Sequence, residues 1–258
     1  MDWIQALIFG LVQGLTEFLP VSSDGHLEIL KHFFGINGDN FIFTVAVHGA
    51  TVLSIILVFW QEIIQLFKGV LKFEMNAETD YSLKLIVSMI PVAIVGFTMK
   101  DKVESLFNGD MVFTGSMLVL TAIFLAVSHF TPKGTKSITY LGAFLMGIAQ
   151  ALAVLPGLSR SGSTISTGLM AGHKKEELTK FSFLMVIVPV LGGTFVEMLS
   201  IDKASGNVTL VPLAISFVTA FVTGYFACKW MVNIVKRGKL YWFAIYCSLL
   251  GASLILFS

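Results

Sequence analysis

Two polar stretches interrupt the apolar sequence: Glu17-Phe-Leu-Pro-Val-Ser-Ser-Asp-Gly-His26 and Leu155-Pro-Gly-Leu-Ser-Arg-Ser-Gly-Ser-Thr164. In a bilayer, unpaired backbone groups and charges are costly, so irregular polar backbone occurs at depth only where it lines a cavity or a site. The first stretch carries Glu17 and His26, and the second carries Arg160. These charges indicate chemistry on an anion inside a membrane.

The composition around these stretches is that of a polytopic membrane protein. Hydrophobic residues make up 55% and charged residues only 13% of the chain, and the mean hydropathy is +0.84, well outside ordinary soluble usage. We expect one all-α membrane domain, residues 1–258, surrounded by membrane lipids. The net charge of +1 is divided among the loops, so no nucleic-acid partner is expected. Six segments have the roughly 20 apolar residues that a span needs: 41–60, 81–99, 112–130, 179–200, 209–231 and 240–257.

Two further regions are too short to span and are predicted to be re-entrant hairpins. Residues 2–19 have a helical pattern that ends at Pro20, and the piece at 26–35 is only about ten residues, or ~15 Å of helix. A helix of this length covers only half of a bilayer, so the two helices together should enter the membrane and return to the side from which they came. The second hairpin is predicted from helices at 138–155 and 163–172, with a loop at 156–162.

The two halves of the chain resemble each other in sequence. Gly10-Leu-Val-Gln13 matches Gly147-Ile-Ala-Gln150, which divides the chain into repeats at 1–131 and 132–258. Each repeat has one hairpin and three spans, and because three is odd the second hairpin should enter from the opposite side. The prediction is an inverted-topology repeat whose loops meet near the membrane midplane. That architecture suits a transporter, and it equally suits an enzyme acting on a lipid headgroup.

The basic residues of the loops predict the orientation. One side collects Lys68, Lys72, Lys133, Lys136, Lys174, Lys175, Lys180, Lys236, Arg237 and Lys239. The other side has Lys100, Lys102 and Lys203, with Lys31 in the first hairpin. The basic side should be cytoplasmic, so that both termini and the mouth of the first hairpin face outward.

Both polar stretches run into short helices whose first turns are suited to phosphate. Ser and Asp are favoured N-caps, and the free N–H groups and positive dipole at a helix N-terminus bind anions. Glycine allows close approach of the backbone. The expected substrate-binding residues are Gln13, Ser22, Gly25, Gly157, Ser159, Ser161, Gly162 and Thr164.

Arg160 and Glu17 are charged residues within the membrane, where a charge is costly and usually has a function. Arg160 can bind phosphate through paired hydrogen bonds; the alternative is an ion pair with Glu17 that links the two halves. Glu17 would repel a diphosphate unless a divalent cation, Mg²⁺ or Ca²⁺, bridges them or the acid is protonated. Gln13 lies one helical turn before Glu17 and could orient it or contact the same ligand.

The first polar stretch also places serine hydroxyls and a histidine imidazole within one helical turn of each other. His26 is near enough in sequence to Ser22 and Ser23 for a nucleophile–base pair, and His itself can be phosphorylated. The sequence leaves open whether Ser23 or His26 is the nucleophile. His48 lies within a predicted span, where a position at the site and a role in close helix packing beside Gly49 are both open.

With these motifs the chain resembles the bacterial undecaprenyl pyrophosphate phosphatase family, also called the BacA or bacitracin-resistance family. The resemblance rests on Gln13-Gly-Leu-Thr-Glu17, continued to His26, and on Pro156-Gly-Leu-Ser-Arg-Ser-Gly-Ser-Thr164. It implies hydrolysis of undecaprenyl diphosphate in the bacterial plasma membrane, which recycles the lipid carrier for cell-wall synthesis. It further implies a requirement for a divalent cation, a homodimer, and catalytic roles for Glu17, Ser23, His26 and Arg160, with Glu17 at the metal.

Two departures from the family pattern concern charge. Gln13 stands where Glu is frequent, and Asp24 stands in place of a small hydroxyl residue; Asp24 could restore the missing acid. A secondary transporter or lipid flippase is the main competing interpretation. The Ser-Ser-Asp-Gly-His run favours the enzyme, because transport alone needs no nucleophile beside a base.

Overall fold

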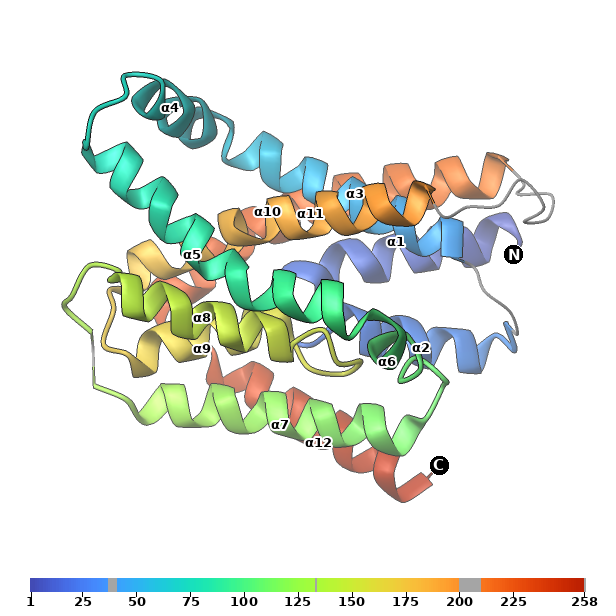
Figure 1. The fold of residues 1–258 in the computed structure, drawn as a ribbon. Helices are drawn as coiled ribbons and strands as arrows, with labels where there is room; N and C mark the ends of the chain where they lie inside the picture. The colour runs from blue at the N-terminus through green and yellow to red at the C-terminus, as the bar shows by residue number, and fades with distance from the viewer. Residues whose placement is uncertain (37–40, 133, 200–209, 258) are drawn as a thin grey trace.

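The computed structural model describes residues 1–36, 41–132, 134–199 and 210–257, and this part of the chain is all helical (Figure 1). The helices are α1 (Trp3–Phe18), α2 (Ser23–Phe33), α3 (Phe41–Val58), α4 (Trp60–Val70), α5 (Ala77–Thr98), α6 (Lys100–Glu104), α7 (Met111–Phe130), α8 (Tyr140–Leu152), α9 (Arg160–Met170), α10 (Lys175–Leu199), α11 (Leu210–Arg237) and α12 (Tyr241–Phe257). The all-α class predicted from the sequence is therefore confirmed.

Helices occupy all six predicted spans as far as the described residues extend; residues 200 and 209, at the ends of two predicted spans, lie outside them. The helices α5, α7, α10 and α11 are long and apolar enough to cross a membrane. A fifth candidate is α3, which is followed by α4 after a bend of 74°. The 17 residues of α12 give ~26 Å of helix, near the lower limit for a span. The helices α4 and α6 were not predicted.

The outer surface consists largely of apolar side chains at helical spacing. On α5, Ile86, Ile90 and Ile94 are 56%, 45% and 57% exposed, and α11 and α12 carry similar rows. Monomeric soluble proteins rarely expose contiguous apolar surface on this scale, whereas lipid solvates it. Together with the long apolar helices, this surface identifies a multi-pass membrane protein.

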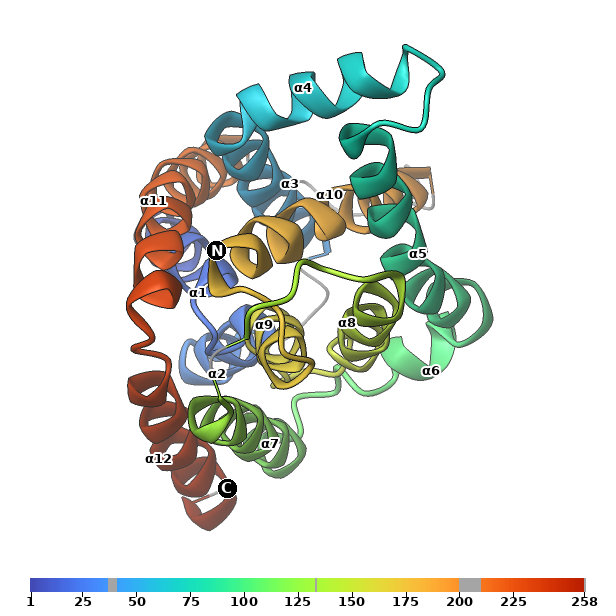
Figure 2. The ribbon, with the colours of Figure 1, turned by 90° about the vertical axis from the view of Figure 1, so that its left-hand side faces the viewer.

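The pairs α1–α2 and α8–α9 are helical hairpins that enter from opposite ends of the molecule and turn inside it (Figure 1). The helix α1 packs along α11, and α8 packs along α5. Viewed along the helices, α9 lies in the interior, with α7, α8 and α10 around it (Figure 2). The two hairpin turns therefore lie between the long helices.

The short helices begin earlier than the sequence predicts. We expected α2 to begin near His26 and α9 at residue 163, but they begin at Ser23 and Arg160. The reason is N-capping: Ser22 Oγ accepts from Gly25 N at 3.3 Å, and Ser159 Oγ accepts from Gly162 N at 3.1 Å. Ser23 and Arg160 are thus the first residues of their helices and belong to the N-terminal turns, where backbone N–H groups have no partner within the helix.

Basic loops are segregated by end of the molecule. The connections α4–α5, α7–α8, α9–α10 and α11–α12 lie at the end away from both chain termini (Figure 1). The opposite end holds α6 with Lys100 and Lys102. Lys133 and Lys203, which also entered the orientation prediction, lie outside the described residues.

Candidate active site

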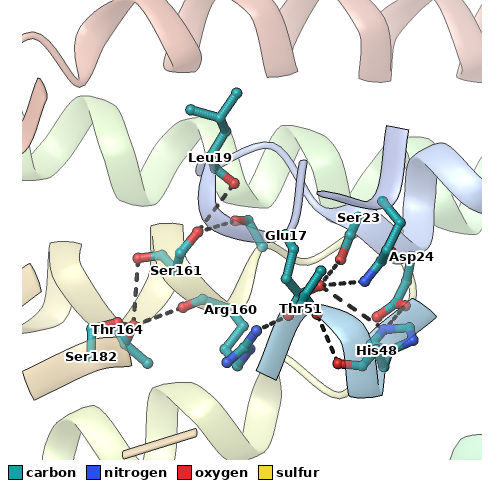
Figure 3. Close-up of polar contacts among 12 residues, drawn as sticks. Glu17, Leu19, Ser23, Asp24, His48, Thr51, Arg160, Ser161, Thr164 and Ser182 are labelled. Atoms are coloured by element: carbon teal, nitrogen blue, oxygen red, sulfur yellow. Dashed lines mark hydrogen bonds and ion pairs between the residues drawn. The ribbon is translucent and has the colours of Figure 1, made fainter. Parts of the chain in front are cut away.

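The turns of the two hairpins touch. Ser161 Oγ, at the start of α9, donates to the carbonyl oxygen of Leu19 at 3.1 Å (Figure 3). A Cβ on Gly25 would lie 3.2 Å from Gly157 Cα, tighter than side chains normally allow. Gly157 also has a φ of +93°, a conformation that favours glycine. Glycine at these two positions lets the two polar stretches meet.

Glu17 is the centre of the contact between the hairpins. Its Oε2 accepts from Ser23 Oγ at 2.6 Å and from Gln13 Nε2 at 3.0 Å, and its Oε1 pairs with the guanidinium of Arg160 (Figure 3). The residue is only 8% exposed. A buried carboxylate needs such partners because an unpaired one is expensive in low dielectric. The result is a hydroxyl, an acid and a guanidinium gathered from α1, α2 and α9.

These residues line a cavity of about 220 Å³. From the first hairpin come Thr16, Glu17, Ser22, Ser23 and Asp24. The second hairpin supplies Gln150, Ala153, Val154, Leu158, Ser159 and Arg160. The remaining wall is His48 of α3, Val92 of α5 and three residues of α10, namely Val186, Pro189 and Val190. A polar floor formed by both hairpins therefore meets an apolar wall from α5 and α10.

His48 belongs to this cavity, which decides between the two interpretations that the sequence left open. Its Nε2 lies 3.3 Å from Asp24 Oδ1 and 4.0 Å from Glu17 Oε2, and its Nδ1 lies 2.9 Å from the carbonyl oxygen of Thr44 (Figure 3). Both close partners are acceptors, so the doubly protonated imidazolium satisfies them together. His48 thereby pairs with the acid that departs from the family pattern.

His26 is not brought to the cavity. Its Nδ1 lies 2.7 Å from the carbonyl oxygen of Ser22, and its Nε2 lies 2.7 Å from the Tyr246 hydroxyl, with the two rings stacked at 5.7 Å. Because a carbonyl only accepts, Nδ1 carries the proton and Nε2 accepts from the tyrosine. Both ring nitrogens are used, and neither faces Ser23. The expected pairing of a nucleophile with this imidazole is absent from the geometry.

The other predicted binding residues divide into those at the cavity and those that hold the turns. Ser22 and Ser159 line the cavity. Thr164 instead bonds Ser182 Oγ at 2.6 Å. Gln13 is wholly buried behind Glu17. The remaining members of the predicted set, which brace the turns and do not line the cavity, are Gly25, Gly157, Ser161 and Gly162.

Sequence reasoning left Gln150 out of the site. Gln150 matches Gln13 in the internal repeat, and this equivalence was the signal that could have found it. It is 2% exposed and lines the cavity. Asp24 was noted for its charge, but its pairing with His48 depends on how α3 packs against α1, α10 and α11, which a single sequence does not encode locally.

The oxygen atoms of the cavity can hold a divalent cation only if a bound ligand supplies further oxygen atoms. Among the described residues, no group of three or more His, Cys, Asp or Glu side chains is arranged to hold a metal. However, the carboxylates of Glu17 and Asp24 both line the cavity, and they lie 4.0 Å and 3.3 Å from one common atom, His48 Nε2. Mg²⁺ is typically held by one or two carboxylates plus phosphate oxygens and water. These oxygens fit an ion of that kind.

Comparison with known proteins assigns the family. Residues 6–253 match the family described as bacitracin resistance protein BacA. A protein of Parabacteroides distasonis named undecaprenyl-diphosphatase is 52% identical over 256 residues, covering 97% of this chain and 96% of the relative. Relatives of the same name from Bacteroides fragilis and Carboxydothermus hydrogenoformans are 50% and 37% identical, covering 100% and 99% of this chain and 99% and 97% of their own lengths. The chain is therefore a member of the BacA family.

Proposed function

We propose that this chain hydrolyses undecaprenyl diphosphate to undecaprenyl phosphate and inorganic phosphate, which returns the lipid carrier to cell-wall synthesis. The relatives' names supply the substrate. The observation that carries the chemistry is the Ser23 hydroxyl on the Glu17 carboxylate, with Arg160 on the other carboxylate oxygen. A hydroxyl, a proton acceptor and a phosphate-binding cation thus share one polar cavity in a membrane.

In the first step Ser23 Oγ attacks the terminal phosphorus of the diphosphate. Its proton passes to Glu17 Oε2, which already accepts from this hydroxyl at 2.6 Å. The bond from the terminal phosphorus to the bridging oxygen breaks, and undecaprenyl phosphate leaves. In the second step water attacks the phosphorus of the phosphoserine, the bond from phosphorus to Ser23 Oγ breaks, and Glu17 returns its proton to Ser23 Oγ. Inorganic phosphate leaves as H₂PO₄⁻ and carries both protons of the water.

Arg160 stabilises the negative charge that spreads over the transferring phosphoryl group. One guanidinium nitrogen holds Glu17, and the remaining N–H donors are available to phosphate oxygens. Ser23 and Arg160 are the first residues of α2 and α9, so free backbone N–H groups and two helix dipoles add to this stabilisation.

His26 acts on the reaction by positioning Ser23. Ser22 has a φ of +66°, which costs energy for a residue with a side chain. The Nδ1 of His26 holds the carbonyl oxygen of this residue, and Tyr246 holds the ring. The strained peptide before Ser23 is thereby fixed, and the hydroxyl stays on Glu17.

A divalent cation, Mg²⁺ or Ca²⁺, is proposed as cofactor. Glu17 and Asp24, whose carboxylates line the cavity, would hold it together with oxygens of the diphosphate. When bound, such an ion neutralises charge on the phosphate groups. It also resolves the repulsion between an anionic substrate and two acids.

We infer that the fold is an inverted-topology repeat with six spans, divided at residues 131 and 132. Entry of the hairpins from opposite ends supports this, and so do the equivalent packings of α1 on α11 and α8 on α5. The segregated basic loops support a cytoplasmic location for the end away from the termini. The cavity would then open outward from the bacterial plasma membrane, with the prenyl chain in the bilayer along the apolar wall. A homodimer is proposed from the family resemblance alone.

Phosphate release from undecaprenyl diphosphate tests the function. The purified protein in detergent is assayed with and without Mg²⁺ or Ca²⁺, beside Ser23→Ala and, as a control, Ser253→Ala in α12. We expect metal-dependent release that only Ser23→Ala abolishes. Folded wild-type protein that binds the lipid without releasing phosphate would contradict the phosphatase and favour the transporter.

A further inference from the structure

Gln150 presents an amide with no partner to the active-site cavity. The residue is 2% exposed, and neither its Nε2 nor its Oε1 has a hydrogen-bond partner. Buried amides without partners are costly, and most are paired in native proteins. Since this amide lines the cavity together with Arg160 and Ser159, the missing partner is expected to be a ligand in that cavity.

The internal repeat shows why Gln150 is free. Gln13 occupies the equivalent place on α1, and its Nε2 donates to Glu17, four residues later. The residue four positions after Gln150 is Val154, which also lines the cavity and offers no acceptor. The two equivalent glutamines therefore differ in role: Gln13 donates to the carboxylate of Glu17, whereas the amide of Gln150 lines the cavity without a partner.

The charges of the cavity define what Gln150 can bind. Glu17 is engaged by Arg160 and Ser23, and Asp24 is engaged by His48. An uncharged donor with no partner, in the same cavity as the guanidinium of Arg160, suits an oxygen-rich anion. The amide oxygen can at the same time accept from a protonated phosphate oxygen or from water. A diphosphate offers both kinds of partner.

We propose that Gln150 is a further substrate-binding residue, which donates from Nε2 to an oxygen of the diphosphate head group. The proposal rests on the proposed phosphatase function and extends its site to α8. Both hairpins then supply binding groups: Ser23 and Glu17 come from the first, and Arg160 and Gln150 from the second.

Stability and binding should respond in opposite directions to loss of this amide. Gln150→Met keeps the length of the side chain and removes both polar atoms. Replacing a buried polar group that lacks a partner by an apolar one stabilises the ligand-free protein, so its melting temperature should rise. A glutamine with a structural role would give a lower melting temperature.

Inorganic diphosphate is the probe for binding. A hydrogen bond to a charged group corresponds to between about 10-fold and about 100-fold in affinity. We expect Gln150→Met to raise the inhibition constant of diphosphate and the KM for undecaprenyl diphosphate by such a factor. Gln150→Glu, which is isosteric but anionic, should weaken binding further. Ser166→Ala is the control, because this buried hydroxyl of α9 bonds Ser128 and lies outside the cavity.

The outcomes separate this proposal from the proposed function. If Gln150→Met folds and binds diphosphate as the wild type does, or if wild-type protein does not bind diphosphate, the role of Gln150 is refuted. If wild-type protein binds diphosphate without hydrolysing the lipid, and Gln150→Met binds it more weakly, the binding role stands and the phosphatase function is wrong.

Discussion

Glu17 on α1 and Arg160 at the first position of α9 form an ion pair that joins the two hairpins inside the membrane domain. The side chains are 6% and 20% exposed, so neither charge is well solvated. Sequence alone left open whether Arg160 binds phosphate or pairs with Glu17. The structure shows the pair, and the donors that remain on the guanidinium leave the phosphate role available.

Breaking this pair should reduce both stability and turnover. We expect Arg160→Met to lower the free energy of unfolding by about 3 kcal/mol, because Glu17 is left as a buried unpaired charge. Adding Glu17→Gln should recover part of this loss. Turnover should fall about 10³-fold or more with Arg160→Met, since the transferring phosphoryl group loses its cation. Denaturation in detergent and phosphate release measure the two effects.

The exposed pair Lys180–Glu62 provides the control for the Arg160 variants. Its atoms are 3.8 Å apart, and the side chains are 38% and 34% exposed. Lys180→Met should therefore cost less than about 1 kcal/mol and leave turnover unchanged. Equal losses from Lys180→Met and Arg160→Met would show that burial does not set the strength of the pair at Glu17.

Ser23 and Ser22 should differ in their effects although they are neighbours. Ser23→Ala removes the proposed nucleophile and should abolish turnover. Ser22→Ala removes the N-cap of α2, which costs about 1 kcal/mol of stability, and should leave most of the turnover. Substrate labelled with ³²P on the terminal phosphate should label the wild type after an acid quench and should not label Ser23→Ala. Labelling of Ser23→Ala would show that another residue is the nucleophile.

The convergence of the two hairpins could be predicted because it follows from local signals. Proline, short helix length and charge in an apolar context mark the turns near Pro20 and Pro156, and these signals do not depend on the rest of the fold. They located Glu17, Ser23 and Arg160, which the structure brings together.

The features that could not be predicted from the sequence depend on backbone geometry and tertiary contact. His26 is four residues after Ser22, and in the helix this spacing directs its ring to the Ser22 carbonyl oxygen, where it makes no hydrogen bond to the Ser23 hydroxyl. The pairing of His48 with Asp24 and the free amide of Gln150 depend on where α3 and α8 pack. The bend before α4 was missed because the apolar pattern continues across it.

His26→Ala should lower kcat by roughly 100-fold with little change in KM. Loss of the hydrogen bond to the Ser22 carbonyl lets the strained peptide relax, and a shift of about 1 Å in a reacting group costs about that factor. Tyr246→Phe removes only the outer partner of the ring and should cost less. His129→Ala, on α7, is the control. Recovery of turnover in His26→Ala by added imidazole would instead indicate a proton-transfer role.

Removal of divalent cations by a chelator should stop turnover, and Mg²⁺ or Ca²⁺ should restore it. Asp24→Asn should raise the cation concentration for half-maximal rate by about 10-fold, because it removes a proposed carboxylate ligand. His48→Gln should lower that concentration, because it frees Asp24 from its ion pair. Glu104→Gln, in the exposed pair with Lys100, should change nothing. A shift in the same direction for Asp24→Asn and His48→Gln would contradict the proposed competition for Asp24.

Gly14→Ala should destabilise the protein and displace the site. A Cβ on Gly14 would lie 2.6 Å from Ala220 O and 2.8 Å from Gly224 N, and these are backbone atoms of α11 that cannot turn away. The helices must separate, at a cost of about 1–3 kcal/mol, and Glu17 moves with α1. Gly96→Ala is the control, because its Cβ would meet nothing within 4 Å. Melting temperature and kcat should both fall for Gly14→Ala only. A wild-type kcat in Gly14→Ala would show that the close packing of α1 on α11 does not position Glu17.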